Sequence, residues 1–208
     1  MKGFLKKENI EVLKALKMKM RDVYSISKLR TGVMNIGDLY SERGYAYADV
    51  NPITKINESS RTVDVNIEVD RGRKVYVGEI TVIGNTRTLD NVIRREFRLK
   101  EGELFDSVKL KRSKQRINNL QFFEDVKIDT RRGKEPDLVE IITTVTERQT
   151  GSINVGAGFS SNENLIFNAG ISQNNFMGTG RRLVFSTNLS SRRTDFNLSF
   201  TDPRIFDT

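Results

Sequence analysis

The chain of 208 residues contains no cysteine, no histidine and no tryptophan, and it has only three prolines. Without cysteine and histidine, it lacks the usual protein ligands of zinc, a thiol nucleophile and the base of a Ser-His-Asp triad. The lack of cysteine also excludes disulfides, which fits the cytosol and a Gram-negative envelope equally well. An enzyme of this composition would have to work with carboxylates, lysines and tyrosines alone. We expect no enzyme here, with no catalytic residues, no metal ligands and no cofactor.

Long apolar segments are missing too. The basic start, MKGFLKK, is not followed by an apolar core of signal-peptide length, and no run of about eighteen apolar residues could form a membrane helix. The net charge is +8, but the excess of basic residues is spread along the chain and forms no basic block. Charge alone therefore gives no reason to expect nucleic-acid binding.

One sequence unit occurs twice. When the chain is shifted by 81 residues against itself, identical residues coincide, and they include Gly84, Lys109, Leu110, Ile117 and Leu120, which fall on Gly3, Lys28, Leu29, Ile36 and Leu39. Past Leu120 the shift becomes 76, because the first copy carries five extra residues, and LVEIITTVTER then matches TVDVNIEVDRG. A duplication explains the shared order of these matches better than chance.

The second copy predicts which elements make up the unit. Thr88 and Asp106 are expected N-caps, and Ser25 is the counterpart of Asp106 in the first copy. Two helices on one face of a three-stranded sheet would form an α+β layer. In chain order the unit has a strand (73–85), two helices (88–97 and 106–120) and a hairpin (122–132 and 137–148).

The first helix of the second copy carries one apolar stripe. Leu89, Ile93 and Phe97 repeat at every fourth position, so we expect all three in the core. The first copy begins at the residue that matches Gly84, and its first strand is therefore not expected in the chain. We interpret Met1 as a point of truncation, and we expect the first unit to be the weaker of the two.

The composition changes after Thr150, where charge falls and glycine, asparagine and serine become frequent. Apolar residues alternate with small or polar ones in SINVGAGF, NLIFNAGIS, RRLVFSTNLS and DFNLSF. A soluble antiparallel sheet over a core and a membrane barrel both show this alternation. No helix follows that could cover the apolar faces, so the pattern favours antiparallel strands that begin a transmembrane β-barrel.

Gly178 and Gly180 in NNFMGTGRRLVF have the spacing of a phosphate-binding loop. A dinucleotide loop needs a third glycine and a helix after it. Position 183 is a leucine instead, and the residues that follow alternate as a strand. We therefore predict that both glycines are turn residues with positive φ.

These segments resemble known families. The β-α-α-β-β unit resembles the POTRA domain. The segments GNTRTLDNVIRREFRLKEGELFD, TERQTGSINVGAGFSS, NNFMGTG and FTDP together resemble the BamA family of outer-membrane β-barrel assembly factors. The resemblance divides the chain into the penultimate POTRA domain without its N-terminus (1–72), the last POTRA domain (73–149) and the first three barrel strands (150–208).

The resemblance implies an outer-membrane protein with its POTRA domains in the periplasm, which folds and inserts other β-barrel proteins without ATP. It implies periplasmic lipoproteins of the assembly machine, unfolded outer-membrane clients and outer-membrane lipid as partners, and no nucleic acid. Glu101 and Gly102 match the pair at which the family contacts a lipoprotein. A related translocation or secretion pore of the same superfamily is an alternative.

The first barrel strand is the predicted pairing edge for a client strand. To close the barrel, this strand must pair with the last barrel strand, and we call this junction the seam. Gly156 and Gly158 weaken the interior of the first strand. When the seam opens, it exposes backbone N–H and C=O groups with which a client strand can pair. In the alternative view the two glycines only make room in the barrel lumen. The predicted edge comprises Ser152, Ile153, Asn154, Val155, Gly156, Ala157, Gly158 and Phe159.

A function of another class also fits the composition. The second helix of the second copy has a strongly basic outer face, with Arg112, Lys114 and Arg116. A soluble module could use these side chains to bind a polyanion such as nucleic acid. A steep salt dependence of DNA binding would favour this alternative over membrane assembly.

Overall fold

The computed structural model describes residues 6–19 and 22–204. By its internal contacts the chain divides into two units. The first unit comprises residues 1–80, 98–112 and 130–141, and the second comprises residues 81–97, 113–129 and 142–208. None of the helices in the described ranges is long and apolar enough to cross a membrane.

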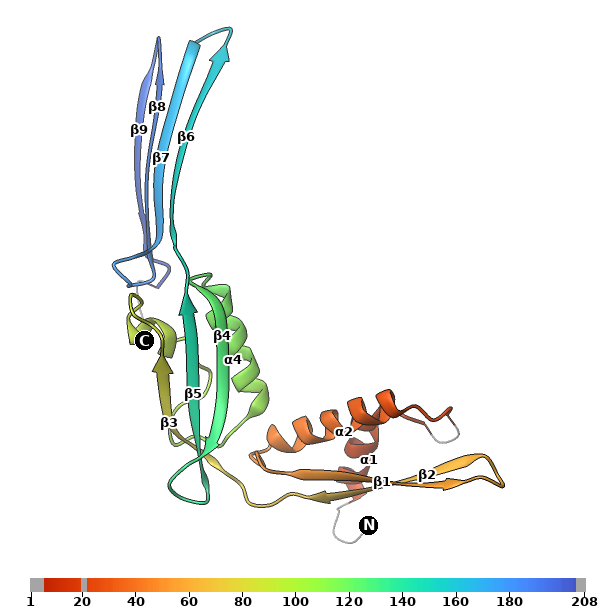
Figure 1. Cartoon of the computed structure of the whole chain (residues 1–208). Helices are drawn as coiled ribbons and strands as arrows, with labels where there is room; N and C mark the ends of the chain where they lie inside the picture. Colours follow the sequence, from red (N-terminus) through yellow and green to blue (C-terminus); the bar gives the residue numbers. More distant parts are fainter. Residues whose placement is uncertain (1–5, 20–21, 205–208) are drawn as a thin grey trace. The chain divides into compact units, whose positions relative to one another are not determined.

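The first copy of the repeat contains two helices and a hairpin, α1 (Lys6–Leu16), α2 (Ile26–Ser41), β1 (Asp49–Asn57) and β2 (Thr62–Asp70) (Figure 1). The strands β1 and β2 pair antiparallel as a two-stranded sheet, which matches the two strands expected for this copy. The predicted N-cap of α2 is confirmed, because the Ser25 hydroxyl accepts a hydrogen bond from the Lys28 backbone N–H.

The second copy shows the complete unit. Its elements are β3 (Tyr76–Ile83), α3 (Asp90–Arg94), α4 (Ser107–Asn119), β4 (Phe123–Arg132) and β5 (Leu138–Glu147), and the sheet order is β3-β5-β4 (Figure 1). This order confirms the predicted β-α-α-β-β unit and the α+β fold class.

The two predicted helix caps in the second copy have different outcomes. Asp106 caps α4 as predicted, because its carboxylate accepts hydrogen bonds from the backbone N–H groups of Val108 and Lys109. The prediction for Thr88 is wrong, since α3 begins one residue later and Leu89 occupies the N-cap position without a side-chain hydrogen bond. The Thr88 hydroxyl instead accepts a hydrogen bond from Asn175.

A buried core lies where α3 and α4 of the second copy pack against the sheet β3-β5-β4. Ile93 and Ile117 are fully buried, and burying a side chain of this size contributes about 1.5–3 kcal/mol. The prediction that Leu89 belongs to this core is wrong, because Leu89 is half exposed. The buried cluster comprises Val92, Ile93, Ile117, Phe122, Phe123, Val126 and Val145.

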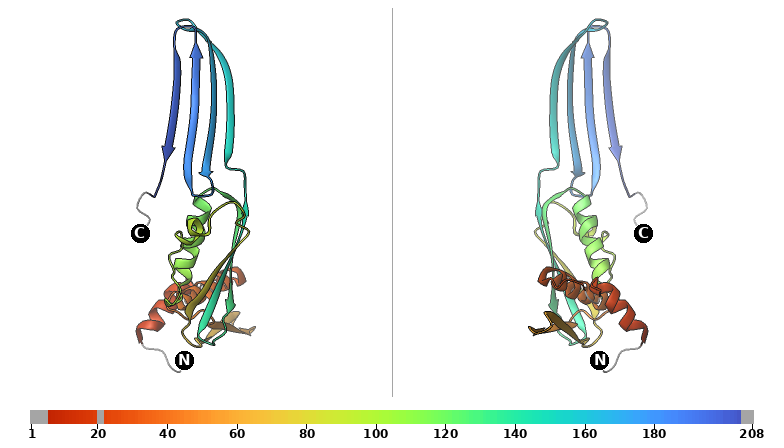
Figure 2. Two further views of the ribbon diagram at one scale, coloured as in Figure 1. Left: turned by 90° about the vertical axis from the view of Figure 1, so that its left-hand side faces the viewer. Right: turned by 90° about the vertical axis from the view of Figure 1, so that its right-hand side faces the viewer.

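The last part of the described chain is a four-stranded antiparallel sheet in the order β6-β7-β8-β9. Its strands lie side by side in Figure 2. Residues 150–208 were expected to hold three barrel strands, and the sheet has one more, because DFNLSF alternates like the other segments and pairs with β8. The strands are β6 (Gly151–Ser160), β7 (Asn164–Phe176), β8 (Arg181–Ser190) and β9 (Thr194–Thr201).

Candidate strand-pairing edge

The strand β6 forms one edge of this sheet. It pairs with β7 in continuous register from Gly151↔Gln173 to Ser160↔Asn164, and within the described residues its other side has no strand partner. All eight residues of the predicted pairing edge, from Ser152 to Phe159, lie in β6. An unpaired edge presents a row of backbone N–H and C=O groups that a further strand can use.

One face of β6 is polar or small. The hydroxyls of Ser152 and Ser172 lie 2.8 Å apart across the β6–β7 pair. A Cβ atom at Gly156 would lie 2.4 Å from the side-chain oxygen of Asn168, whereas a Cβ atom at Gly158 would meet no atom within 4 Å. The neighbour at position 156 is the end of an exposed side chain that can move, so packing requires a glycine at neither position.

The opposite face of the four strands is apolar and open. Its side chains are between 41% and 81% exposed, and the rings of Phe185 and Phe196 stack with their centroids 6.5 Å apart. A water-soluble protein rarely exposes an apolar surface of this extent, whereas a barrel strand turns such a face to lipid. The face comprises Ile153, Val155, Phe159, Leu165, Phe167, Ile171, Phe185, Leu189, Phe196, Leu198 and Phe200.

The strands also have the length that a bilayer requires. The strands β6 and β8 each have 10 residues and β7 has 13. At about 3.3 Å per residue and a tilt of about 40°, ten residues rise roughly 25 Å, which matches the apolar band of an outer-membrane barrel. The strand β9 is shorter, with 8 residues.

The β7–β8 turn is fixed to the loop that precedes α3. The Asn175 side-chain amide donates to the Thr88 hydroxyl and its oxygen accepts from the Gly180 N–H, both at 2.8 Å. The Leu89 N–H donates to the Gly178 carbonyl at 3.0 Å. We call these residues, Arg87, Thr88, Leu89, Asn175, Gly178 and Gly180, the turn joint.

The two glycines of the turn joint confirm the prediction of positive φ. The φ angles are +73° at Gly178 and +76° at Gly180. A Cβ atom at Gly178 would lie 2.0 Å from the Arg87 carbonyl oxygen, so only glycine allows the turn to approach this backbone. The glycine spacing predicted the turn, but nothing local in the sequence indicated what the turn packs against.

Glu147, the last residue of β5, holds the same loop from the other side. Its carboxylate accepts hydrogen bonds from the Thr86 hydroxyl (2.8 Å), the Arg87 N–H (2.9 Å) and the Thr88 N–H (2.6 Å). Burial alone would raise the pKa of Glu147, but the hydrogen bonds from Thr88, Thr86 and Arg87 lower this pKa overall. Glu147 therefore connects the strand that leads into β6 with the turn joint.

Glu96 is a buried carboxylate just after α3 that forms ion pairs with Arg95, Arg116 and Arg204. It accepts a hydrogen bond from the Arg116 Nε and another from an Arg204 Nη, both at 2.8 Å. Of the three basic residues proposed for polyanion binding, Arg112 and Lys114 are exposed, whereas Arg116 forms this ion pair. Pairing with Glu96 reduces the charge that Arg116 could offer to a polyanion.

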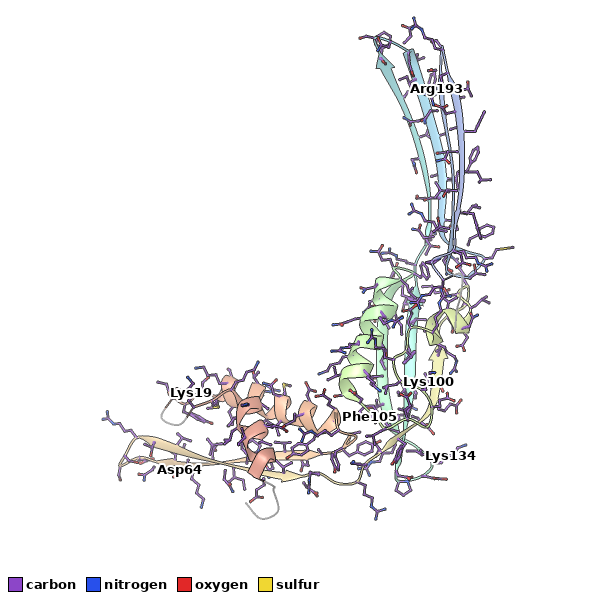
Figure 3. All side chains as sticks on the ribbon, turned by 180° about the vertical axis from the view of Figure 1, so that it is seen from behind. Lys19, Asp64, Lys100, Phe105, Lys134 and Arg193 are labelled. Carbon is purple, nitrogen blue, oxygen red and sulfur yellow. The ribbon has the colours of Figure 1, made fainter. Side chains whose placement is uncertain are left out.

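The predicted docking residues Glu101 and Gly102 lie in an exposed turn between α3 and α4. Figure 3 labels Lys100 and Phe105, which stand on either side of this turn. Glu101 is not simply a solvated charge, because its carboxylate accepts a hydrogen bond of 3.0 Å from the Ile80 N–H on β3. Gly102 has a φ of +84°, and its N–H donates to the Val77 carbonyl.

In the described ranges, no group of three or more acidic side chains is placed so that it could hold a metal ion. The surface built by β6–β9 and the loop before α3 has three features. They are an open strand edge, an apolar face and a hydrogen-bonded turn joint.

Comparison with known proteins agrees with this geometry. A family model for POTRA, described as surface antigen variable number repeat, matches residues 2–72 and 75–148. The outer membrane protein assembly factor BamA of Neisseria meningitidis is 36% identical over 93% of the chain and 24% of its own length. The BamA protein of Nitratidesulfovibrio vulgaris is 30% identical over 94% of the chain and 25% of its own length.

A solved structure shows the same likeness. The crystal structure of BamA from Haemophilus ducreyi lacking POTRA domains 1–3 matches with a TM-score of 0.83 and 35% identity. The match covers 99% of the chain and 39% of that structure. The chain spans about a quarter of the length of the curated relatives that it matches.

Proposed function

Because the chain belongs to the POTRA family and is similar to BamA proteins through the repeat and the strands, we propose that it assembles outer-membrane proteins. The similarity confirms the predicted resemblance and the predicted location, an outer membrane protein with its POTRA domains in the periplasm. The activity, clients and partners of the whole protein are our proposals.

The observation that carries this function is the edge position of β6 in its sheet, beside an exposed apolar face. We propose that the edge accepts a strand of an unfolded client, which then has backbone hydrogen-bond partners before it leaves water. The client's own next strand can replace β6 as folding proceeds. Exchange of one strand pairing for another needs no ATP and no catalytic residue.

Gly158 supports the use of β6 as a seam. A glycine in a strand interior removes side-chain packing and adds backbone entropy to the open state. The space beside Gly158 is open, so no close neighbour requires a glycine there. A seam that is weak for this reason opens at low cost while its backbone groups remain available to a client.

The POTRA domains supply the docking surface in this proposal. We propose that the turn of Glu101 and Gly102 contacts a periplasmic lipoprotein of the assembly machine, because both residues are exposed. The apolar face of β6–β9 would contact outer-membrane lipid. Nucleic acid is not part of the proposal, since Arg116 is paired with Glu96.

A disulfide across the seam tests the proposal, and the chain contains no cysteine that could interfere. In the full-length protein, one cysteine replaces Asn154 in β6 and a second is placed in the strand that closes the barrel against β6. Oxidation should slow client insertion into vesicles by at least about tenfold, and a reducing agent should restore it. Equal insertion rates in the oxidised and reduced protein would show that the seam does not act.

A further inference from the structure

Two apolar side chains protrude from the turn joint. Met177 in the β7–β8 turn is 78% exposed, and Leu89 at the start of α3 is 49% exposed. The two belong to one hydrogen-bonded assembly, because the Leu89 N–H donates to the carbonyl of Gly178, the neighbour of Met177. Leu89 has the spacing of a core residue and still lies outside the core.

The backbone of Met177 adds a second observation. Its φ is +52°, in the left-handed region that costs an L-residue about 1–2 kcal/mol. The Asn175 carbonyl accepts a hydrogen bond from the Gly178 N–H, and this turn holds Met177 in place. A strained backbone that exposes a large apolar side chain is typical of a functional contact, so we expect a partner that binds the Met177 side chain.

The position of Arg181 shows where the apolar face ends. By strand alternation Arg181 lies on the same face as Leu183 and Phe185, and its guanidinium carbon lies 6.0 Å from the Phe200 ring centroid. The Arg181 Nε also donates to the Asp202 carboxylate at 2.8 Å. A charged side chain beside an aromatic ring is typical of the boundary between lipid tails and headgroups. Arg181 pairs with Phe176, so Met177 follows directly on the periplasmic side of this boundary.

We propose that Met177 and Leu89 insert together into the headgroup boundary of the periplasmic leaflet, so that the last POTRA domain touches the membrane through the start of α3. The partner is phospholipid, because Met177 directly follows Phe176, which pairs with Arg181 at the end of the apolar face. In addition, the exposed Arg87 precedes Leu89 by two residues, where it can meet a headgroup phosphate. This inference rests on the proposed function, since it requires β6–β9 to span the bilayer.

The contact gives the turn joint a role in the proposed assembly. Leu89 is attached to the barrel turn through its own backbone and to β5 through the loop that Glu147 binds. Lipid contact at Leu89 and Met177 would therefore fix the start of α3 at the membrane surface. The end of β5, which leads into β6, would be held at the membrane surface as well.

Single-cysteine variants of the full-length protein test the inference. Cysteine replaces Leu89, Met177, Phe167 or Lys134 in turn, and each variant is labelled at this cysteine with an environment-sensitive fluorophore. The labelled protein is placed in phosphatidylcholine vesicles whose acyl chains carry bromine either near the headgroup or deep in the bilayer. Leu89 and Met177 are exposed, so their replacement leaves the core intact. Phe167 lies in the middle of the apolar face, and the exposed Lys134 in the β4–β5 turn is the control in water (Figure 3).

The expected pattern has three parts. Labels at Leu89 and Met177 lose about half of their emission to shallow bromine, because an interfacial side chain lies about 5–10 Å into the headgroup boundary. The label at Phe167 is quenched more strongly by deep bromine, and the label at Lys134 is quenched by neither. In vesicles with added phosphatidylglycerol, Arg87→Gln reduces the quenching at Leu89 by about twofold, because it removes the charge that meets the phosphate.

Two outcomes would overturn the inference. If Phe167 is quenched while Leu89 is not, the strands span the bilayer but the POTRA domain does not touch it, and the partner of Leu89 is a protein instead. If Phe167 is not quenched by deep bromine, the placement of β6–β9 in the bilayer is wrong, and the proposed function fails together with the inference.

Discussion

The side-chain amide of Asn175 donates a hydrogen bond of 2.8 Å to the hydroxyl of Thr88, 87 residues earlier in the chain. Asn175 lies at the end of β7 and Thr88 just before α3, so this bond joins the strand sheet to the second POTRA repeat, which matches residues 75–148. Both side chains are buried, and the Asn175 oxygen accepts from the Gly180 N–H in addition.

Replacement of Asn175 by alanine should loosen the turn joint. It removes two buried hydrogen bonds and leaves Thr88 without this donor, a loss of about 1–3 kcal/mol. Amide exchange at Leu89 and Gly180 should accelerate by about tenfold or more. Asn174→Ala is the matched control, because Asn174 is exposed, and it should leave both rates within about twofold.

Two glycines with similar φ should respond differently to substitution by alanine. Gly102→Ala adds only the strain of a left-handed residue, about 1–2 kcal/mol, because nothing lies within 4 Å of the new Cβ atom. Gly178→Ala adds the same strain and places the Cβ atom 2.0 Å from the Arg87 carbonyl. The Leu89 amide should lose its exchange protection in Gly178→Ala and keep it in Gly102→Ala. Equal protection in the two variants would show that the turn joint is not tight.

The loop before α3 should loosen in acid. The pKa of Glu147 is lowered in the folded protein from an ordinary value of 4.5, so its stabilising effect is fully present above that value. The effect is lost as the pH falls through the lowered pKa of the folded state. The backbone amide signals of Arg87 and Thr88 should therefore shift in an NMR titration below pH 4.5, and in Glu147→Gln this transition should be absent.

Glu101 should have two separable roles. Glu101→Lys removes the acceptor of the Ile80 N–H and should cost about 0.5–1.5 kcal/mol of stability, more than the change within about 0.5 kcal/mol expected for an ordinary surface charge. Glu101→Gln keeps an oxygen acceptor and removes only the charge. It should weaken binding of the lipoprotein partner in a co-purification assay while stability stays within about 0.5 kcal/mol. Unchanged binding in both variants would exclude the docking role.

Much of the fold could be predicted because its signals are local. The cap at Asp106 follows from one carboxylate and the backbone amides two and three residues later. The left-handed turn at Gly178 and Gly180 follows from the glycines themselves. The strands after Thr150 follow from the alternation of apolar residues, including the fourth strand that the expected number omitted.

The contacts that could not be predicted join residues far apart in the chain. Threonine is a common helix N-cap, but the Thr88 hydroxyl accepts a hydrogen bond from Asn175, and the helix starts later than predicted. Leu89 fits a core stripe, yet its side chain is half exposed and its N–H donates to Gly178, 89 residues later. The hydrogen bond that Glu101 accepts could not be predicted, because its partner Ile80 lies on a strand 21 residues earlier.

The most direct test of the central claim is disulfide crosslinking between β6 and a client during insertion. Single cysteines at Ser152 or Asn154 in β6 are compared with one at Ser186 in β8, which has strand partners on both sides. The client carries one cysteine in an edge strand. We predict that the client crosslinks to Ser152→Cys and Asn154→Cys but not to Ser186→Cys. Crosslinking at Ser186→Cys to the same extent, or insertion without any crosslink to β6, would contradict the account.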